Sequence, residues 1–300
     1  MADYDVSIVI ATKDRQLHLV NCVQSIGEQA TPPLQVIIVN DGKLNPHNRE
    51  RIESALPADT ELILTDNSDA SGLSDARNTG IEIATGEIVL FLDDDTILGP
   101  NFVRQLRDSY RTHDTDRLAG IGGIDGSRKT TASRIFHAVF YLRARGWVIN
   151  PAGIQVSDHR ITQPVEAEWL PGYAASFKRD VIAEEPFASW EGGRESFEDV
   201  EYAWRIKSQG YHFIADPTLE VTHLRAESNE GAFTEWIKGG RNRVRIFRRH
   251  GSLFFLPLLL WSGFGEFLKP LLTGAIHGDA INQVAKGTGY LMGFISELLR

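Results

Sequence analysis

The sequence has little cysteine, no excess of positive charge and no long uninterrupted apolar run. Its single cysteine, Cys22, excludes an intrachain disulfide and a cysteine-rich zinc site, and it agrees with a reducing, cytoplasmic location. The formal net charge is −9, from 31 Lys and Arg against 40 Asp and Glu. Because contacts to phosphate backbones need a basic surface, this charge argues against a nucleic-acid partner.

Signals for export and for membrane crossing are also weak. The N-terminus has no basic flank before its first strand-like run, so we expect no signal peptide. The longest apolar stretch, residues 253–264, is shorter than the roughly 20 residues of a spanning helix, and Pro257 interrupts it. A core helix, a re-entrant segment and an interfacial segment all stay open as interpretations of it.

The first hundred residues alternate between strand and helix signals. Continuous apolar runs typical of buried parallel strands occupy residues 6–11, 36–39, 62–64 and 88–92. Helical patterns occupy residues 15–28 and 71–84. The alternation predicts an α/β fold, in which ligands bind beyond the carboxyl ends of the strands. Thr12, Asp41 and Asp93 to Asp95 all lie at those ends.

The pattern changes further along the chain. We expect helices at residues 131–145 and 198–209, strands near 168–177 and 211–223, and a glycine-rich turn near 120–126. From about residue 230 a basic amphipathic helix begins, with Arg241, Arg245 and Arg248 on one face, and apolar helical sequence follows it. The predicted division is an α/β domain over residues 1–228 and a helical extension over residues 229–300.

Three adjacent carboxylates follow the strand at residues 88–92. Asp93, Asp94 and Asp95 repel one another, and a divalent cation would supply the missing counter-charge. Mg²⁺ and Mn²⁺ bind carboxylate oxygens and commonly bridge to a diphosphate. The alternative is a solvated acidic turn, but the position directly after a buried strand favours the metal. Asp41 is either a turn residue or an acceptor for a ribose or base.

Four segments together resemble glycosyltransferase family 2. They are VSIVIATKDR, VIIVNDG, GLSDARNTGIEIATGEIVLFLDDD and FEDVEYAWRIKSQGY, and the resemblance covers about residues 5–225. It implies a GT-A fold, which is a mostly parallel nucleotide-binding sheet flanked by helices, followed here by the C-terminal helical extension. It also implies an inverting, Mn²⁺- or Mg²⁺-dependent hexosyl transfer from a nucleotide-diphosphate sugar, with UDP favoured and GDP or dTDP open.

The resemblance assigns residues to the donor site and to the metal. The expected nucleotide-sugar residues are Ala11, Thr12, Arg15, Asp41, Arg77, Asp93 and Asp94. The expected metal ligands are Asp93 and Asp95, from the acid–any–acid (DXD) motif, and His223. For Arg77 the alternative is a surface arginine paired with Asp75 or Glu82. For His223 the alternative is a structural histidine.

The resemblance also assigns the catalytic and acceptor residues. Glu198 and Asp199 form the expected acidic pair, of which the second usually acts as general base toward the acceptor hydroxyl. The alternative is capping of the following helix by the two acids. Arg205 either orients Asp199 or pairs with Glu201. The expected acceptor residues are Trp169, Gly172 and Tyr173, although both aromatic residues are equally compatible with a core position.

Two positions depart from the family pattern. Lys43 replaces the serine that often follows Asp-Gly, and Phe197 replaces the glycine that commonly precedes the acidic pair. The Gln-x-x-Arg-Trp motif of processive polymer synthases is absent, which favours one sugar per acceptor. A nucleotidylyltransferase would carry a glycine-rich loop with a lysine after the first strand, and ATKDR is not such a loop. The other alternative is a non-catalytic carbohydrate- or lipid-binding protein.

The basic helix suggests where the protein acts. A basic amphipathic helix next to an apolar segment is typical of attachment to anionic lipid. We therefore expect peripheral attachment to the inner face of the cell membrane, and a glycan or polyprenyl-linked acceptor used in surface polysaccharide or lipid-linked oligosaccharide assembly. The alternative is a helix whose basic face is solvated and whose other face packs on the catalytic domain, with residues 253–300 as its core partner or a dimer contact.

Overall fold

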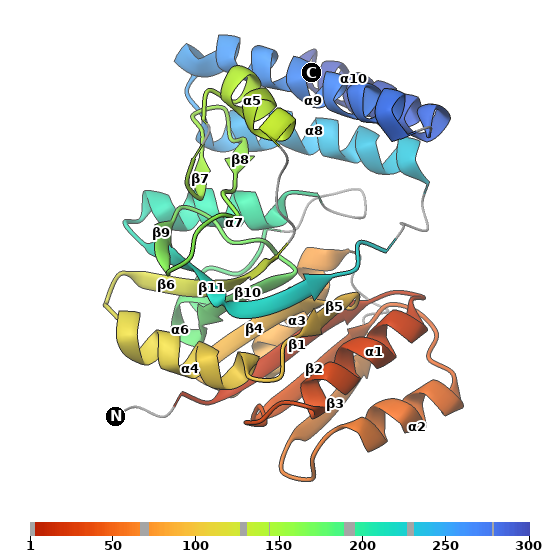
Figure 1. Cartoon of the computed structure of the whole chain (residues 1–300), viewed down its shortest axis with the longest axis vertical. Coiled ribbons are helices and arrows are strands. Elements are labelled where there is room, and N and C mark those ends of the chain that lie inside the picture. The colour runs from red at the N-terminus through yellow and green to blue at the C-terminus, as the bar shows by residue number, and fades with distance from the viewer. Residues whose placement is uncertain are drawn as a thin grey trace.

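The chain folds into an α/β part and a layer of helices stacked on it, with the two ends of the chain in different layers (Figure 1). The computed structural model describes residues 4–66, 72–126, 131–143, 145–188, 196–226, 231–277 and 279–300.

The first half of the α/β part is an alternation of strands and helices. Its elements are β1 (Val6–Thr12), α1 (Gln16–Gly27), β2 (Gln35–Asn40), α2 (Pro46–Ala55), β3 (Glu61–Asp66), α3 (Leu73–Ile83) and β4 (Ile88–Asp93). β1 pairs in parallel with β2 and β4, and β2 pairs in parallel with β3. All the strands and helices expected here are confirmed, and α2 was missed. α2 has few apolar residues but is begun by Asn45, whose side chain accepts from the backbone of Asn48, and by Pro46.

The second half completes the sheet. Its elements are β5 (Thr96–Leu98), α4 (Phe102–His113), β6 (Leu118–Asp125), α5 (Thr131–Phe140), β7 (Val148–Ile149), β8 (Gln155–Val156), β9 (Val165–Ala167), β10 (Ala174–Lys178), α6 (Arg179–Glu184), α7 (Glu198–Ser208) and β11 (His212–His223). The strand order is β3-β2-β1-β4-β10-β6-β11-β5, with β9 also paired to β11. β10, β5 and β9 run against the other strands of this nine-stranded sheet, so the expected mostly parallel α/β fold is confirmed.

Two expectations in this half are wrong. The predicted strand at 168–177 is interrupted, because Pro171 and Gly172 lie in a loop and β10 begins at Ala174. The predicted glycine-rich turn is largely a buried strand, β6. A Cβ atom on Gly120 would lie 2.1 Å from the Ser176 backbone oxygen, so the glycine lets β10 and β6 approach each other.

Both faces of the sheet are covered. Alternate side chains of β1 point to opposite faces: Ile8 and Ile10 join the core under α1 and α4, and Val9 joins the core under α3, α6 and α7. The carboxyl-end edge of the parallel strands carries the polar residues that the sequence analysis singled out.

The helical layer consists of α8 (Ala232–His250), the 3₁₀ turn η1 (Leu253–Phe255), α9 (Leu256–His277) and α10 (Ala280–Leu298). α8 and α10 approach closely, because a Cβ atom on Gly240 would lie 2.1 Å from the Tyr290 backbone oxygen. α5 lies against this layer (Figure 1). The contact includes a hydrogen bond from Trp261 Nε1 to the Val139 carbonyl at 2.9 Å. The layer therefore also recruits a helix from within residues 1–228, and the division at residue 228 stays a prediction.

α9 corrects the expectation that Pro257 interrupts the apolar segment. Pro257 is the second residue of the helix, where a missing N–H is tolerated, and Pro270 is accommodated inside the helix. Residues Leu253–Thr273 have a mean hydropathy of 1.2, so by length and composition alone this segment could cross a membrane. The segment is 28% buried inside the protein.

Candidate active site

The ends of β1 and β4 are tied together by Asp94. Its carboxylate accepts a hydrogen bond from Thr12 Oγ1 at 2.7 Å and forms an ion pair with Arg15 NH2 at 2.5 Å. Burial raises the pKa of Asp94, and the charge of Arg15 and the hydrogen bond from Thr12 oppose that rise only in part. Ala11 lies beside Asp93 in the sheet register. The structure thus brings five of the residues expected around the donor into one place.

Asp93, Asp95 and His223 form the cluster that could hold a metal. One ligand atom from each lies within 4.8 Å of the others, and His223 Nε2 is 3.2 Å from Asp95 Oδ1. The antiparallel pairing of β11 with β5 places His223 opposite Thr96 and therefore next to the acids. Burial raises the pKa of Asp95, but the bonds from His223 and from the Ala226 N–H outweigh it and lower the pKa to about 2.

Arg77 connects this cluster to the acidic pair. Its NH1 atom donates to Glu198 at 2.7 Å, and its NH2 atom donates to the Gly172 carbonyl at 3.1 Å and to Asp93 at 3.3 Å. The residue is 2% exposed, and its guanidinium lies over the ring of Phe187. The alternative of a surface arginine paired with Asp75 or Glu82 is therefore wrong.

The acidic pair begins α7, and its two members have different surroundings. Glu198 is bound by Arg77, whereas Asp199 accepts hydrogen bonds from the backbone N–H groups of Gly172 at 3.2 Å and Val200 at 2.8 Å. Burial and the charge of Glu198 raise the pKa of Asp199 to about 7, although Arg77 and the two N–H groups oppose the rise. A carboxyl with this pKa can accept a proton near neutral pH.

The alternatives stated for the start of α7 have different outcomes. The N-cap residue Phe197 makes no side-chain cap bond, but Asp199 accepts from the Val200 N–H in the first turn, so a capping contribution of this acid stays open beside its expected catalytic role. Arg205 pairs with Glu185 and, at 3.6 Å, with Glu201, so the alternative of pairing with Glu201 is confirmed.

Phe197 occupies a conformation that favours glycine. Its φ angle is +69°, in the left-handed region, which explains why glycine is common in the family at this place. The Arg243 guanidinium lies 3.9 Å from the centre of its ring, and Asn242 Nδ2 donates to the Ser196 carbonyl at 3.3 Å. α8 of the helical layer therefore holds the two residues that precede the acidic pair.

The remaining expected residues lie around this centre. The Tyr173 ring stacks on His223 at 4.7 Å, and its hydroxyl accepts from the Asp125 N–H at 3.2 Å. Trp169 is 7% exposed and donates to the Val156 carbonyl at 3.0 Å, so most of it belongs to the core. Asp41 is paired with Lys13 at 2.8 Å. An open cleft of about 640 Å³ beside Arg15 leaves room for a nucleoside.

A second cavity, which no expectation from the sequence covered, lies between the helical layer, α5 and β8 and the two residues that precede α7. Its volume is about 410 Å³. It is lined by His137, Tyr141, Gln155, Ser157, Trp169, Ser196, Phe197, Glu235, Trp236, Gly239, Arg243, Glu266, Lys269 and Tyr290. These residues come from segments far apart in the chain, so no local motif could have marked them. The basic and aromatic pattern of α8 was the one feature of the sequence that could have pointed to this cavity.

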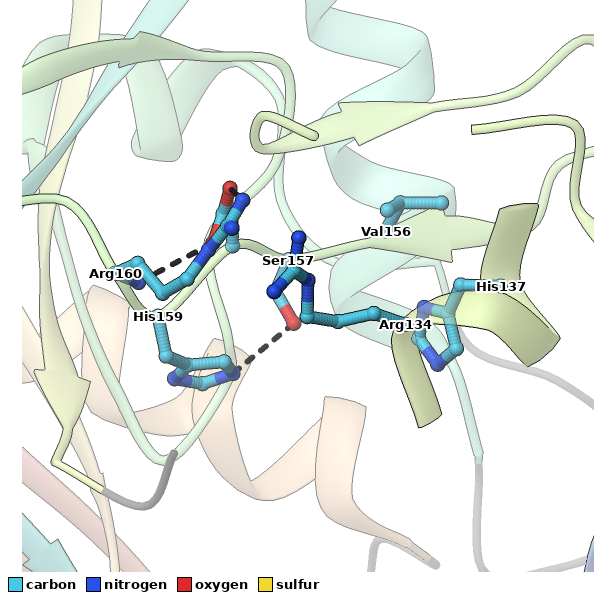
Figure 2. A pocket seen from close by; sticks show the side chains of 7 residues that line it. Arg134, His137, Val156, Ser157, His159 and Arg160 are labelled. Carbon is cyan, nitrogen blue, oxygen red and sulfur yellow. Dashed lines mark hydrogen bonds and ion pairs between the residues drawn. The ribbon is translucent and has the colours of Figure 1, made fainter. Parts of the chain in front are cut away.

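A smaller hollow adjoins this cavity and shares two of its wall residues, His137 and Ser157 (Figure 2). Ser157 Oγ lies 3.1 Å from His159 Nε2, and Arg160 pairs with Asp158. Its volume is about 10 Å³, which holds no more than one water molecule. The larger cavity is therefore the one that could admit a ligand.

Comparison with known proteins supports the fold and the family. Residues 7–160 match the family described as Glycosyl transferase family 2. The Glucosyl-dolichyl phosphate glucuronosyltransferase of Haloferax volcanii is 27% identical over 251 residues, which are 80% of this chain and 76% of that protein. The glycosyltransferase GlyG of Streptococcus pneumoniae is 26% identical over 115 residues, 38% of each chain.

A solved structure has the same fold. It is the mannosyltransferase PcManGT from Pyrobaculum calidifontis in complex with GDP-Man and Mn²⁺, with a TM-score of 0.64, 17% identity and coverage of 99% of this chain and 88% of that chain. The family match extends over half of the chain. This chain therefore belongs to glycosyl transferase family 2 and is a glycosyltransferase.

Proposed function

We propose that this protein transfers one hexosyl unit, with inversion, from a nucleotide-diphosphate sugar to a hydroxyl of a glycan or polyprenyl-linked acceptor, and that Asp199 is the general base. The observation that carries the proposal is the surroundings of Asp199. A partly buried carboxyl whose pKa is raised to about 7 lies near the charge of Arg77, which also reaches Asp93 of the acidic cluster. A proton acceptor and a candidate diphosphate site are thus held by one network.

The acidic cluster fits a divalent cation. Two carboxylates and an imidazole within 4.8 Å of one another are suitable ligands for Mn²⁺, and the carboxylates also suit Mg²⁺. When bound to Asp93, Asp95 and His223, such an ion would neutralise charge on the diphosphate leaving group. PcManGT, which shares the fold, was solved with Mn²⁺ and GDP-Man. The sequence resemblance favours UDP as the nucleotide of the donor. Because PcManGT was solved with GDP-Man, GDP should be tested as well.

The chain's own residues supply the rest of the chemistry. Asp199 takes the proton of the acceptor hydroxyl as the hydroxyl attacks the anomeric carbon, and the Gly172 N–H holds the carboxylate in place. Arg77 holds Glu198 and places a fixed positive charge beside Asp93, where negative charge grows on the leaving group. A single displacement of this kind inverts the anomeric configuration.

We propose a site of membrane attachment other than the basic face expected on α8. Several of the basic side chains of α8 are engaged inside the protein: Arg243 donates to Gln155 at 2.8 Å, and Arg245 lies 3.3 Å from Glu297. The exposed large apolar side chains of α5, η1 and α9 are Ile135, Val139, Leu253, Phe254, Leu260, Trp261, Phe264 and Leu272. α5 and α9 touch, so this apolar surface extends over both, and we propose that it rests on the cytoplasmic face of the membrane.

The proposed reaction is tested by nucleotide binding and by donor hydrolysis. We expect one of UDP, GDP or dTDP to raise the Tm in the presence of Mn²⁺. At a nucleotide concentration of 100 times Kd, binding should raise the free energy of unfolding by about 2.7 kcal/mol. Asp95→Asn should lose this shift, because it removes a carboxylate that is paired with His223. Asp199→Asn should keep the shift and lose transfer by about 10²–10⁴-fold.

Each alternative has its own result. A shift that persists in Asp95→Asn would count against the metal site. Binding without release of nucleotide in the native protein would indicate a non-catalytic binding protein. Full transfer activity in Asp199→Asn would exclude this residue as the base.

A further inference from the structure

The cavity of about 410 Å³ has a wall of mixed chemistry. Its rings come from Tyr141, Trp169, Phe197, Trp236 and Tyr290, its carboxylates from Glu235 and Glu266, and its cationic groups from Arg243 and Lys269. Burial raises the pKa of Glu266, but Lys269 and the hydrogen bond from Tyr141 outweigh burial and lower it, so this carboxylate is ionised. Its volume falls within the range of about 300–1,000 Å³ that is usual for small-molecule sites.

Two neighbouring glycines of α8 show that the space is not a by-product of helix packing. A Cβ atom on Gly240 would collide with the Tyr290 backbone oxygen, so close packing against α10 requires that glycine. A Cβ atom on Gly239 would meet, among the described residues, the Phe197 ring alone, at 3.6 Å, which is an ordinary contact. Glycine inside a helix costs about 1 kcal/mol relative to alanine. Packing does not require glycine at 239, and its missing side chain leaves the cavity open.

Some buried polar atoms of the wall are left with few partners in the described part of the chain. Arg243 is 1% exposed, and although its NH1 and NH2 atoms are bound, its Nε atom has no hydrogen-bond partner among the described residues. The hydroxyl of Tyr290, also 1% exposed, faces Arg243 and has no other hydrogen-bond partner in the same part of the chain. Unpaired buried polar groups are costly, which favours a polar ligand that bonds to them.

We propose that this cavity binds a sugar unit of the acceptor, so that the acceptor is a glycan and the helical layer selects it. A sugar ring has C–H faces that pack on aromatic rings such as Trp236, and hydroxyls that bond to charged groups such as Glu235 and Arg243. A bare aliphatic chain would leave these charges without partners. A free phosphate would face the carboxylates of Glu235 and Glu266. The inference rests on the proposed function and specifies its acceptor.

The cavity also lies near the start of α7, which carries the proposed base. Phe197, which forms part of its wall, directly precedes Glu198 and is two residues from Asp199. A sugar bound here is therefore held close to the proposed base by residues of α8 rather than by the loop that carries Gly172 and Tyr173.

The experiment fills the cavity without disturbing the fold. Gly239→Leu places a side chain in the space, and Gly239→Ala is the matched control because its Cβ fits. The probes are nitrophenyl glycosides of common hexoses in both anomers, and polyprenyl phosphate, each with the donor that native protein hydrolyses. We expect Gly239→Leu to lose transfer to the preferred glycoside by about tenfold or more, with hydrolysis of the donor by water unchanged. Gly239→Ala should retain both activities.

Variants of the wall provide a second measurement. Trp236→Ala should raise the KM for the glycoside. Trp236→Phe should have a KM close to that of the native protein, because it keeps an aromatic face. Glu235→Gln should act in the same direction, whereas Glu50→Gln, an exposed residue of α2, should have no effect.

The outcomes separate the two proposals. Equal glycoside transfer by native protein and Gly239→Leu would overturn the cavity assignment, and so would native transfer to polyprenyl phosphate but to none of the glycosides. In both cases the proposed function would survive. Absence of donor hydrolysis by the native protein would overturn the proposed function and this inference with it.

Discussion

At the scale of single residues, the charges around Asp199 define its expected pH dependence. The carboxyl faces Glu198 on its own helix, Arg77 on α3 and the Gly172 N–H on the loop before β10. Burial and the charge of Glu198 raise the pKa of Asp199 to about 7. The positive charge of Arg77 opposes this rise in pKa. A general base must be ionised, so kcat/KM for transfer should rise with pH and level off above about 7.

Substitution of Arg77 tests this account. Arg77→Gln removes a cation that favours the ionised form of Asp199, so the rise in kcat/KM should move to higher pH. The control is Arg205→Gln, which removes a cation from α7 that pairs with Glu185 and Glu201 instead. A profile that shifts equally in both variants would contradict the assignment, because it would reflect net charge and not the contact.

Phe197 offers a second residue-scale prediction. The left-handed backbone at φ +69° costs a non-glycine residue about 1–2 kcal/mol, while its ring contacts Arg243. Phe197→Ala should lose the contact and keep the strain, and Phe197→Gly should lose the contact and relieve the strain. The glycine variant should therefore be the more stable of the two by about 1 kcal/mol in urea unfolding. Equal stability would mean that the strain is absorbed elsewhere.

At the scale of elements, the surface formed by α5, η1 and α9 predicts how the protein binds lipid. Phe254 is 82% exposed and Leu253 beside it is 81% exposed, and the other large apolar side chains exposed on α5 and α9 extend this surface. In vesicle flotation the protein should therefore bind neutral phosphatidylcholine vesicles as well as anionic ones, and Phe254→Glu should weaken both.

The same assay tests the earlier idea that the basic face of α8 binds the membrane. Arg248 donates to the Leu298 carbonyl at 3.2 Å, and Arg248→Gln serves as the comparison. If binding required anionic lipid and fell in Arg248→Gln but not in Phe254→Glu, α8 would be the attachment site and the apolar surface would need another partner.

At the scale of the whole molecule, Glu201 links the α/β part to the helical layer. It lies on α7, is 1% exposed, and is 2.8 Å from His250 Nε2 and 3.6 Å from Arg249 NH1, both on α8. Burial raises the pKa of Glu201, but the bond from His250 and the charge of Arg205 outweigh burial, and the net effect is a lowered pKa. Breaking a buried pair of this kind typically costs about 3–5 kcal/mol.

The sign of this pKa shift fixes the pH at which the link acts. Because the folded-state pKa is below the unfolded value of 4.5, the stabilisation is present above that value and is lost as the pH falls through the folded-state pKa. Glu201→Gln should therefore lower the free energy of unfolding at pH 7, and the two proteins should converge under acid conditions. A constant difference across that range would mean that shape, not charge, holds the layers together.

Much of the α/β part was predictable because its signals are local. The apolar runs of β1, β2 and β4 identify buried strands, and the polar residues after them must lie at one edge of a parallel sheet. Asp93 and Asp95 were expected there as metal ligands together with His223, and the three side chains do lie together, although their role stays a prediction.

The partners of buried charges were not predictable. Periodicity showed that Arg77 and Arg243 lie on helices, but the first faces Glu198 across 121 positions of sequence and the second packs on Phe197 and Gln155. Helix periodicity predicts which face a residue occupies, and it carries no information about which distant element covers that face.

By itself, then, the amino-acid sequence determined the order of strands and helices, the edge at which Thr12, Asp93 and Asp95 gather and the family to which the chain belongs. The packing of distant elements was needed to show that Asp199 is a partly buried carboxyl with a raised pKa, that the basic helix α8 turns Arg243 inward, and that a cavity opens beside Gly239. The physical reason is that patterns along a chain record local propensity and burial. A shifted pKa or a cavity depends on which neighbours surround a residue. Those neighbours are fixed only when elements far apart in sequence pack together.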